Sequence, residues 1–93
     1  MAKYQLLFII DKDVADEEKE AIVQRFSDLI ATLGGSVENV DKWGIKKYAY
    51  EINHKTEGYY VLIEFEAGAD VPAEIDRQMR NSDSIVRQMI TLA

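Results

Sequence analysis

The order in which two hydrophobic periods follow one another most constrains how this chain can fold. A period of two, typical of strands, runs through residues 59–67, where Val61, Ile63 and Phe65 share one face. Apolar and extended patterns predict further strands over residues 3–10, 36–53 and 85–92. A period near 3.6 predicts a helix over residues 16–33, and a second helix is opened by Asp70-Val71-Pro72 and ended by Ser82-Asp83-Ser84.

The resulting order is β-α-β-β-α-β. Two β-α-β units joined by a hairpin predict a four-stranded antiparallel sheet with both helices on one face, the ferredoxin-like arrangement, as a single α+β domain over residues 1–93. Right-handed crossovers place the first and third strands in the centre. Many unrelated functions share this fold, so it decides no function alone.

Local signals set the expected ends of these elements. Asp13 and Asp16 both qualify as N-cap of the first helix, and Gly34-Gly35 ends it. Gly44 permits a bulge or a bend in the long second strand. The polar residues 53–58 predict a hairpin connection. In the last strand, Val86, Ile90 and Leu92 share one expected face, with Arg87 and Met89 on the other.

Composition excludes several classes of protein. The 93 residues contain no cysteine, which excludes disulfides, thiolate chemistry and cysteine-bound metals. The longest apolar run, Leu6–Ile10, is too short for a membrane span, and residues 1–4 show no secretion signal. We therefore expect a cytoplasmic protein without a membrane partner. With 11 basic and 17 acidic residues the net charge is −6, which argues against a generic nucleic-acid binder.

Catalytic and ligand-binding motifs are weak. His54 has no neighbouring nucleophile pattern, and a solvated loop histidine explains it. The acidic residues 11–20 lack the glycine and closing glutamate of a calcium loop. The glycine pair follows a helix rather than a strand, so it is no phosphate loop. We expect no enzyme activity, no metal, no cofactor and no small-molecule substrate.

Positive charge is concentrated in residues 42–55. Four lysines there oppose one glutamate, and Trp43, Tyr48 and Tyr50 lie between them. Cations interleaved with aromatic side chains suit RNA or a protein partner. An edge strand whose lysines discourage aggregation explains them equally. A second, thinner basic set near the C-terminus comprises Arg77, Arg80 and Arg87.

Four segments, in order along the chain, resemble bacterial small-subunit ribosomal protein six: Lys3-Tyr4, residues 41–53 with Trp43-Gly44 and Ala49-Tyr50-Glu51-Ile52, residues 57–62, and residues 80–89. The resemblance implies a structural constituent of the small ribosomal subunit. It also implies that the chain binds the central domain of small-subunit rRNA together with ribosomal protein eighteen. Ala2, Tyr48 and Leu92 depart from residues common in the family.

Carried onto this sequence, the resemblance implies rRNA contacts at Lys3, Tyr4, Lys46, Lys47, Arg80 and Arg87. It implies partner contacts at Trp43, Tyr48 and Tyr50. The alternative hypothesis is a small regulatory or oligomeric module of ferredoxin-like fold, which binds a metabolite or a second copy through an edge strand.

Overall fold

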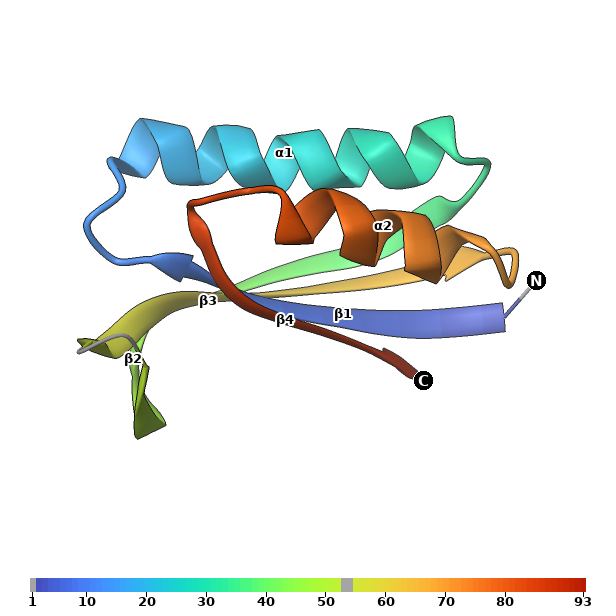
Figure 1. The fold of residues 1–93 in the computed structure, drawn as a ribbon. Coiled ribbons are helices and arrows are strands. Elements are labelled where there is room, and N and C mark those ends of the chain that lie inside the picture. Colours follow the sequence, from blue (N-terminus) through green and yellow to red (C-terminus); the bar gives the residue numbers. More distant parts are fainter. Residues whose placement is uncertain (1, 53–54) are drawn as a thin grey trace.

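The six elements follow one another in the predicted order in the computed structural model (Figure 1). They are β1 (Ala2–Asp11), α1 (Asp16–Thr32), β2 (Ser36–Ile52), β3 (Lys55–Ala67), α2 (Val71–Arg80) and β4 (Ile85–Leu92). The structure describes residues 2–46 and 57–93 in full, and the backbone alone at residues 47–52 and 55–56. The predicted loop histidine, His54, lies outside the described residues.

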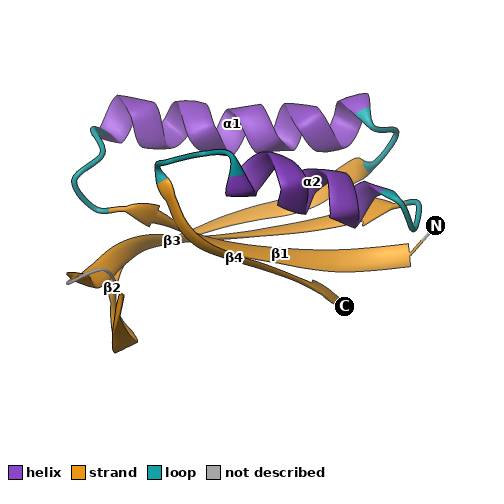
Figure 2. Cartoon of the chain, viewed as in Figure 1, coloured by secondary structure: helices purple, strands orange, loops and turns teal. Residues whose placement is uncertain are grey.

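The strands form one antiparallel sheet in the order β2-β3-β1-β4. Both helices cover the same face of this sheet, and the other face carries no helix (Figure 2). The ferredoxin-like prediction is therefore confirmed, including the central place of β1 and β3. Among the described residues, no helix is long and apolar enough to cross a membrane.

The core lies between the helices and the sheet. The rings of Phe8 in β1 and Phe26 in α1 lie 6.1 Å apart and are both fully buried. Each such side chain contributes roughly 1.5–3 kcal/mol by leaving water. The other fully buried large side chains are Leu6, Ile10, Ile30, Val61, Ile63, Phe65, Ile75 and Met79.

The helix ends differ in part from the sequence prediction. The N-cap of α1 is Ala15, so the prediction of Asp13 or Asp16 was wrong. The carboxylate of Asp11 instead accepts the backbone N–H of Asp13 at 3.0 Å, and Asp16 is already helical. In α2 the N-cap is Asp70 as predicted, although its side chain makes no capping hydrogen bond.

The hairpin between β2 and β3 is tighter than predicted. Backbone pairing continues through Lys47 opposite Glu57 and Ile52 opposite Lys55, so residues 55–58 belong to β3 and not to a connection. The bulge expected near Gly44 is confirmed by a register shift between Lys42 and Gly44, where Gly44 has φ +83°.

The strand β4 departs from strict alternation. A register shift at Ile9/Ile10 of β1 lets Ile85 enter the core, although by alternation it belongs to the face of Arg87. Ile90 packs against the core as predicted. Leu92 pairs with Tyr4 and so lies on the face of Ile90 as predicted, although it is 70% exposed near the end of the sheet.

Candidate interaction surface

The sheet face that the helices leave uncovered is called the open face below. The backbone register orders its side chains into rows that run from β4 across β1 and β3 to β2. Adjacent rows change from aromatic and apolar to acidic. In order along β1 they are Arg87–Ile9–Tyr60–Gly44, Met89–Leu7–Leu62–Asp41, Thr91–Gln5–Glu64–Asn39, and Lys3–Glu66–Ser36.

One end of the open face carries an aromatic corner, formed by Trp43, Lys46 and Tyr60. The Trp43 and Tyr60 rings stack with centroids 6.3 Å apart and planes 10° from parallel. The indole Nε1 donates to a carboxylate oxygen of Asp41 at 3.1 Å, and the Lys46 ammonium lies 5.0 Å from the indole centroid. These contacts hold an indole that is 39% exposed in one orientation.

Alternation along β2 places Trp43 on the open face, and a bulge then brings Lys46 to the same face. Lys42 points to the helical side, where its ammonium forms an ion pair with Glu20 of α1. Gly44 pairs with Tyr60, so the bulge leaves Trp43 as the extra residue between two paired positions. Because of this extra residue, Gly44 and Lys46 follow Trp43 onto the open face. Without it, alternation would place Ile45 on this face in place of Lys46.

The opposite end of the open face is acidic. Glu64 and Glu66 of β3 lie there with Glu38 of β2, whose carboxylate is 3.8 Å from the Lys3 ammonium. The amide of Asn39 donates to Glu64 at 3.4 Å. A shallow pocket at this end is lined by Lys3, Tyr4, Glu38, Glu64, Phe65 and Ala93. The sign of the charge therefore changes across the face.

Four predicted contact residues lie on this surface, Trp43, Lys46 and Arg87 in or beside the row of Tyr60 and Lys3 at the opposite, acidic end. The ring of Tyr4 instead faces the helical side, where it stacks on Phe65 at 5.5 Å and is partly buried. Arg80 ends α2 and forms a 2.9 Å ion pair with Asp76. The side chains of Lys47, Tyr48 and Tyr50 lie outside those that the structure describes.

Sequence reasoning did not select Tyr60 as a candidate contact residue. The available signal was its place in residues 59–67, where Tyr60 and Leu62 share the outer face with Glu64 and Glu66. An aromatic side chain on a face otherwise marked by acids indicates a surface with its own partner. Its stacking on Trp43 depends on the register between β2 and β3, which alternation alone cannot show.

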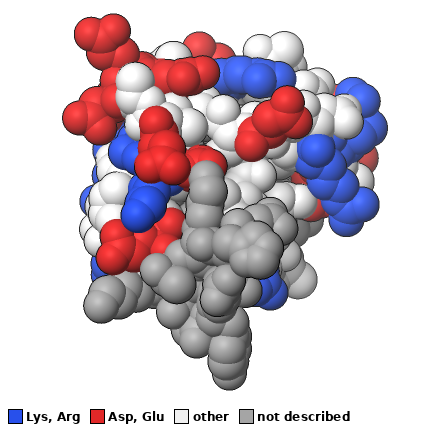
Figure 3. All heavy atoms as spheres, turned by 60° about the vertical axis from the view of Figure 1, so that its left-hand side comes forward, with Lys and Arg blue, Asp and Glu red and all other residues white. Residues whose placement is uncertain are grey.

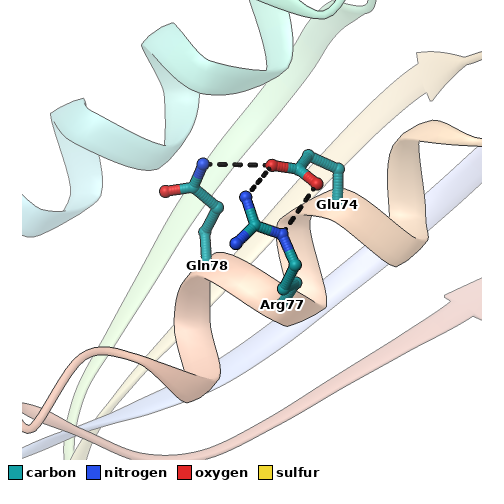
Figure 4. Close-up of polar contacts among 3 residues, drawn as sticks. All are labelled: Glu74, Arg77 and Gln78. Atoms are coloured by element: carbon teal, nitrogen blue, oxygen red, sulfur yellow. Dashed lines mark hydrogen bonds and ion pairs between the residues drawn. The ribbon is translucent and has the colours of Figure 1, made fainter.

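The helix α2 neutralises its own cations. Glu74 accepts hydrogen bonds from the guanidinium of Arg77 and the amide of Gln78 (Figure 4). The Arg77 hydrogen bond, followed by that from Gln78, lowers the pKa of Glu74 to about 2.

Viewed from the end where α1 begins and α2 ends, acidic side chains gather at the upper left and basic ones at the right (Figure 3).

No group of three or more histidine, cysteine or acidic side chains among the described residues is placed to hold a metal ion. The acidic side chains of the first turn of α1 (Asp16, Glu17 and Glu18) lie at its positive end, where their charge is favourable without a ligand.

Comparison with known proteins extends over almost the whole chain. The family model of ribosomal protein S6 matches residues 3–91. Small ribosomal subunit protein bS6 of Clostridium acetobutylicum is 47% identical over 97% of this chain and 95% of that protein. The bS6 protein of Alkaliphilus oremlandii is 43% identical over the same shares.

A crystal structure of 30S ribosomal protein S6 from Thermotoga maritima matches with a TM-score of 0.94 and 30% identity, covering 99% of this chain and 87% of that one. The resemblance seen in the sequence is thereby confirmed, together with the expected location at the ribosome in the bacterial cytoplasm. The chain belongs to the ribosomal protein S6 family of the small ribosomal subunit.

Proposed function

We propose that the chain is a non-catalytic structural constituent of the small ribosomal subunit, which binds the central domain of small-subunit rRNA together with ribosomal protein eighteen. The observation that carries this proposal is the open face. It combines an exposed aromatic corner with cations at one end and acids at the other, in a chain of net charge −6. A surface divided in this way suits two partners of different charge better than one.

The rRNA contact falls first on Arg87 and Lys46. Arg87 is exposed and forms no ion pair with a described residue, and the Lys46 ammonium lies over the Trp43 ring rather than on a carboxylate. Both charges are therefore available to phosphate. To contact phosphate, Lys3 must release or share the carboxylate of Glu38, and Arg80 must do so with the carboxylate of Asp76. Tyr4 and Lys47 complete the proposed set.

The protein partner suits the apolar and acidic rows. Trp43 and Met89 are 39% and 51% exposed, and the half-buried Leu7 and Leu62 lie in the row of Met89. Exposed apolar side chains in contact with one another mark a docking surface, and tryptophan often dominates the energy of such a surface. The acids that follow attract a basic partner. Tyr48 and Tyr50, on the same strand as Trp43, are proposed to extend this surface.

Reconstitution with purified components tests the rRNA assignment. The double variant Lys46→Gln/Arg87→Gln removes two cations of the open face, and Arg25→Gln/Arg77→Gln removes two exposed cations from the helices. Binding to a central-domain rRNA fragment is measured with ribosomal protein eighteen present, over a range of salt concentrations. We expect the first variant to lose on the order of tenfold in affinity and about 1.4–1.8 units of salt slope, since each of the two phosphate contacts contributes about 0.7–0.9.

The helix variant controls for the change in net charge. It should bind within about twofold of the unchanged chain, because a long-range field is largely screened at physiological salt. Equal losses in both variants would reject the open face as the rRNA-binding surface. Unchanged binding of the open-face variant, with melting temperature also unchanged, would reject the two residues named here.

A further inference from the structure

Met89 lies on the open face, in the edge strand β4. Its side chain is 51% exposed, and the register places it beside Leu7, in the row that continues to Leu62. Met79, on the buried side of α2, is fully excluded from solvent. The residues that the structure describes thus include one accessible and one shielded methionine, which differ in exposure but not in chemistry.

A thioether is the group in this chain that peroxide oxidises most readily. The sequence has no cysteine, so no thiolate competes with methionine for the oxidant. The sulfur lone pair attacks one peroxide oxygen, the O–O bond breaks, and that oxygen stays on the sulfur as a sulfoxide. The second oxygen leaves as water with both protons. The sulfur loses two electrons and hydrogen peroxide gains them.

We propose that Met89 is an oxidation site, and that its conversion to the sulfoxide by hydrogen peroxide weakens docking of the protein partner on the open face. This inference rests on the proposed function. The sulfoxide places a strong hydrogen-bond acceptor in the row of Leu7 and Leu62, whose side chains have no donor to offer it. A partner that covers this row must bury the new oxygen without a hydrogen bond, which costs affinity.

The same geometry makes assembly protective. A partner seated on the open face covers the thioether, so oxidation is confined to protein that has not yet assembled. The extent of Met89 oxidation therefore depends on whether the chain is docked. Oxidised copies should enter new particles less readily than unmodified ones. Met79 is shielded by the core in both states and supplies an internal reference.

The test uses the purified full chain, hydrogen peroxide, and purified ribosomal protein eighteen. Peptide mass spectrometry locates the added oxygen, and calorimetric titration measures affinity before and after treatment. We expect modification of Met89 ahead of Met79, and an affinity loss on the order of tenfold at unchanged melting temperature. Methionine sulfoxide reductase should restore binding.

Two variants make the test specific. Met89→Leu keeps an apolar side chain that peroxide does not modify, so treatment should leave its affinity unchanged. Met79→Leu is the matched control and should lose affinity on treatment as the unchanged chain does. Full modification of Met89 with unchanged affinity would overturn the inference, and so would modification of Met79 first. An untreated chain that fails to bind the partner would instead refute the proposed function and, with it, the docking effect.

Discussion

Substitution of either of the two glycines that end α1 should destabilise the protein, but for a different physical reason at each position. Gly34 has φ +88°, and a Cβ added there meets nothing within 4 Å. At Gly35 an added Cβ would lie 2.9 Å from Cγ2 of Ile30 and 3.0 Å from the backbone oxygen of Glu66. The first position therefore needs a left-handed backbone, and the second needs space.

Both glycines also complete the helix terminus. The N–H of Gly34 donates to the carbonyl of Ala31 at 3.1 Å, and the N–H of Gly35 donates to that of Ile30 at 2.9 Å. This is the Schellman pattern, with Gly34 at C′. Alanine in the left-handed region costs about 1–2 kcal/mol, and asparagine costs less because it visits that region more easily.

Crowding at Gly35 should reverse the relative stability of the two variants, so that asparagine destabilises the protein more than alanine does. The atoms that an added Cβ meets cannot move away cheaply, since Ile30 is fully buried and the Glu66 oxygen belongs to β3. Overpacking of this kind costs about 1–3 kcal/mol for one methyl group, and asparagine, being larger, should cost more than alanine. The predicted order of stability is thus Gly, Asn, Ala at position 34 and Gly, Ala, Asn at position 35.

Urea denaturation of the four single variants measures this reversal. The midpoint should fall with little change in the slope, since each variant exposes the same surface on unfolding. In a domain of this size a loss of 1 kcal/mol lowers the melting temperature by about 4–8 °C, so the expected differences are resolvable. The same order of stability at both positions would refute the assignment of strain to one glycine and crowding to the other.

Two further predictions concern titration and fluorescence. The pKa of Glu74 is held at about 2, so the stability that its hydrogen bonds confer should be present above the carboxyl's ordinary pKa and lost as pH falls toward 2. In an NMR titration, Arg77→Gln should raise this pKa toward its ordinary value of 4.5. Trp43 is the only tryptophan, so its emission should shift to shorter wavelength when the partner covers the open face; an unchanged spectrum at saturating partner would contradict its place in that interface.

The fold could be predicted from the sequence because its signals are local and agree with one another. Alternation in residues 59–67 and the apolar faces of residues 3–10 place two central strands, and these residues supply much of the core. The misplaced N-cap of α1 shows the limit of this reasoning. Several acids precede that helix, but the turn made by Asp11 and Asp13 leaves Ala15, and none of the acids, at the N-cap.

The open face could be predicted only in part. Composition indicated Trp43 and Lys46, because cations and aromatic residues are neighbours in the sequence there. It could not bring Arg87 into the row of Tyr60, since that row crosses three strands and depends on how β4, β1 and β3 are paired. Rows of this kind are properties of the sheet and are not visible along the sequence.

Ion pairing decides how an acidic chain can contact RNA at all. Among the cations whose side chains are described, most already face a carboxylate: Lys3, Lys12, Lys19, Lys42, Arg77 and Arg80. The open face then offers two available charges, Lys46 and Arg87, and two phosphate contacts give a salt slope of only about 1.4–1.8. Such a slope is too small for tight binding by charge alone. A complex with a steep salt dependence must therefore draw most of it from the basic partner, and a steep slope for this chain by itself would show that carboxylates release their cations on binding.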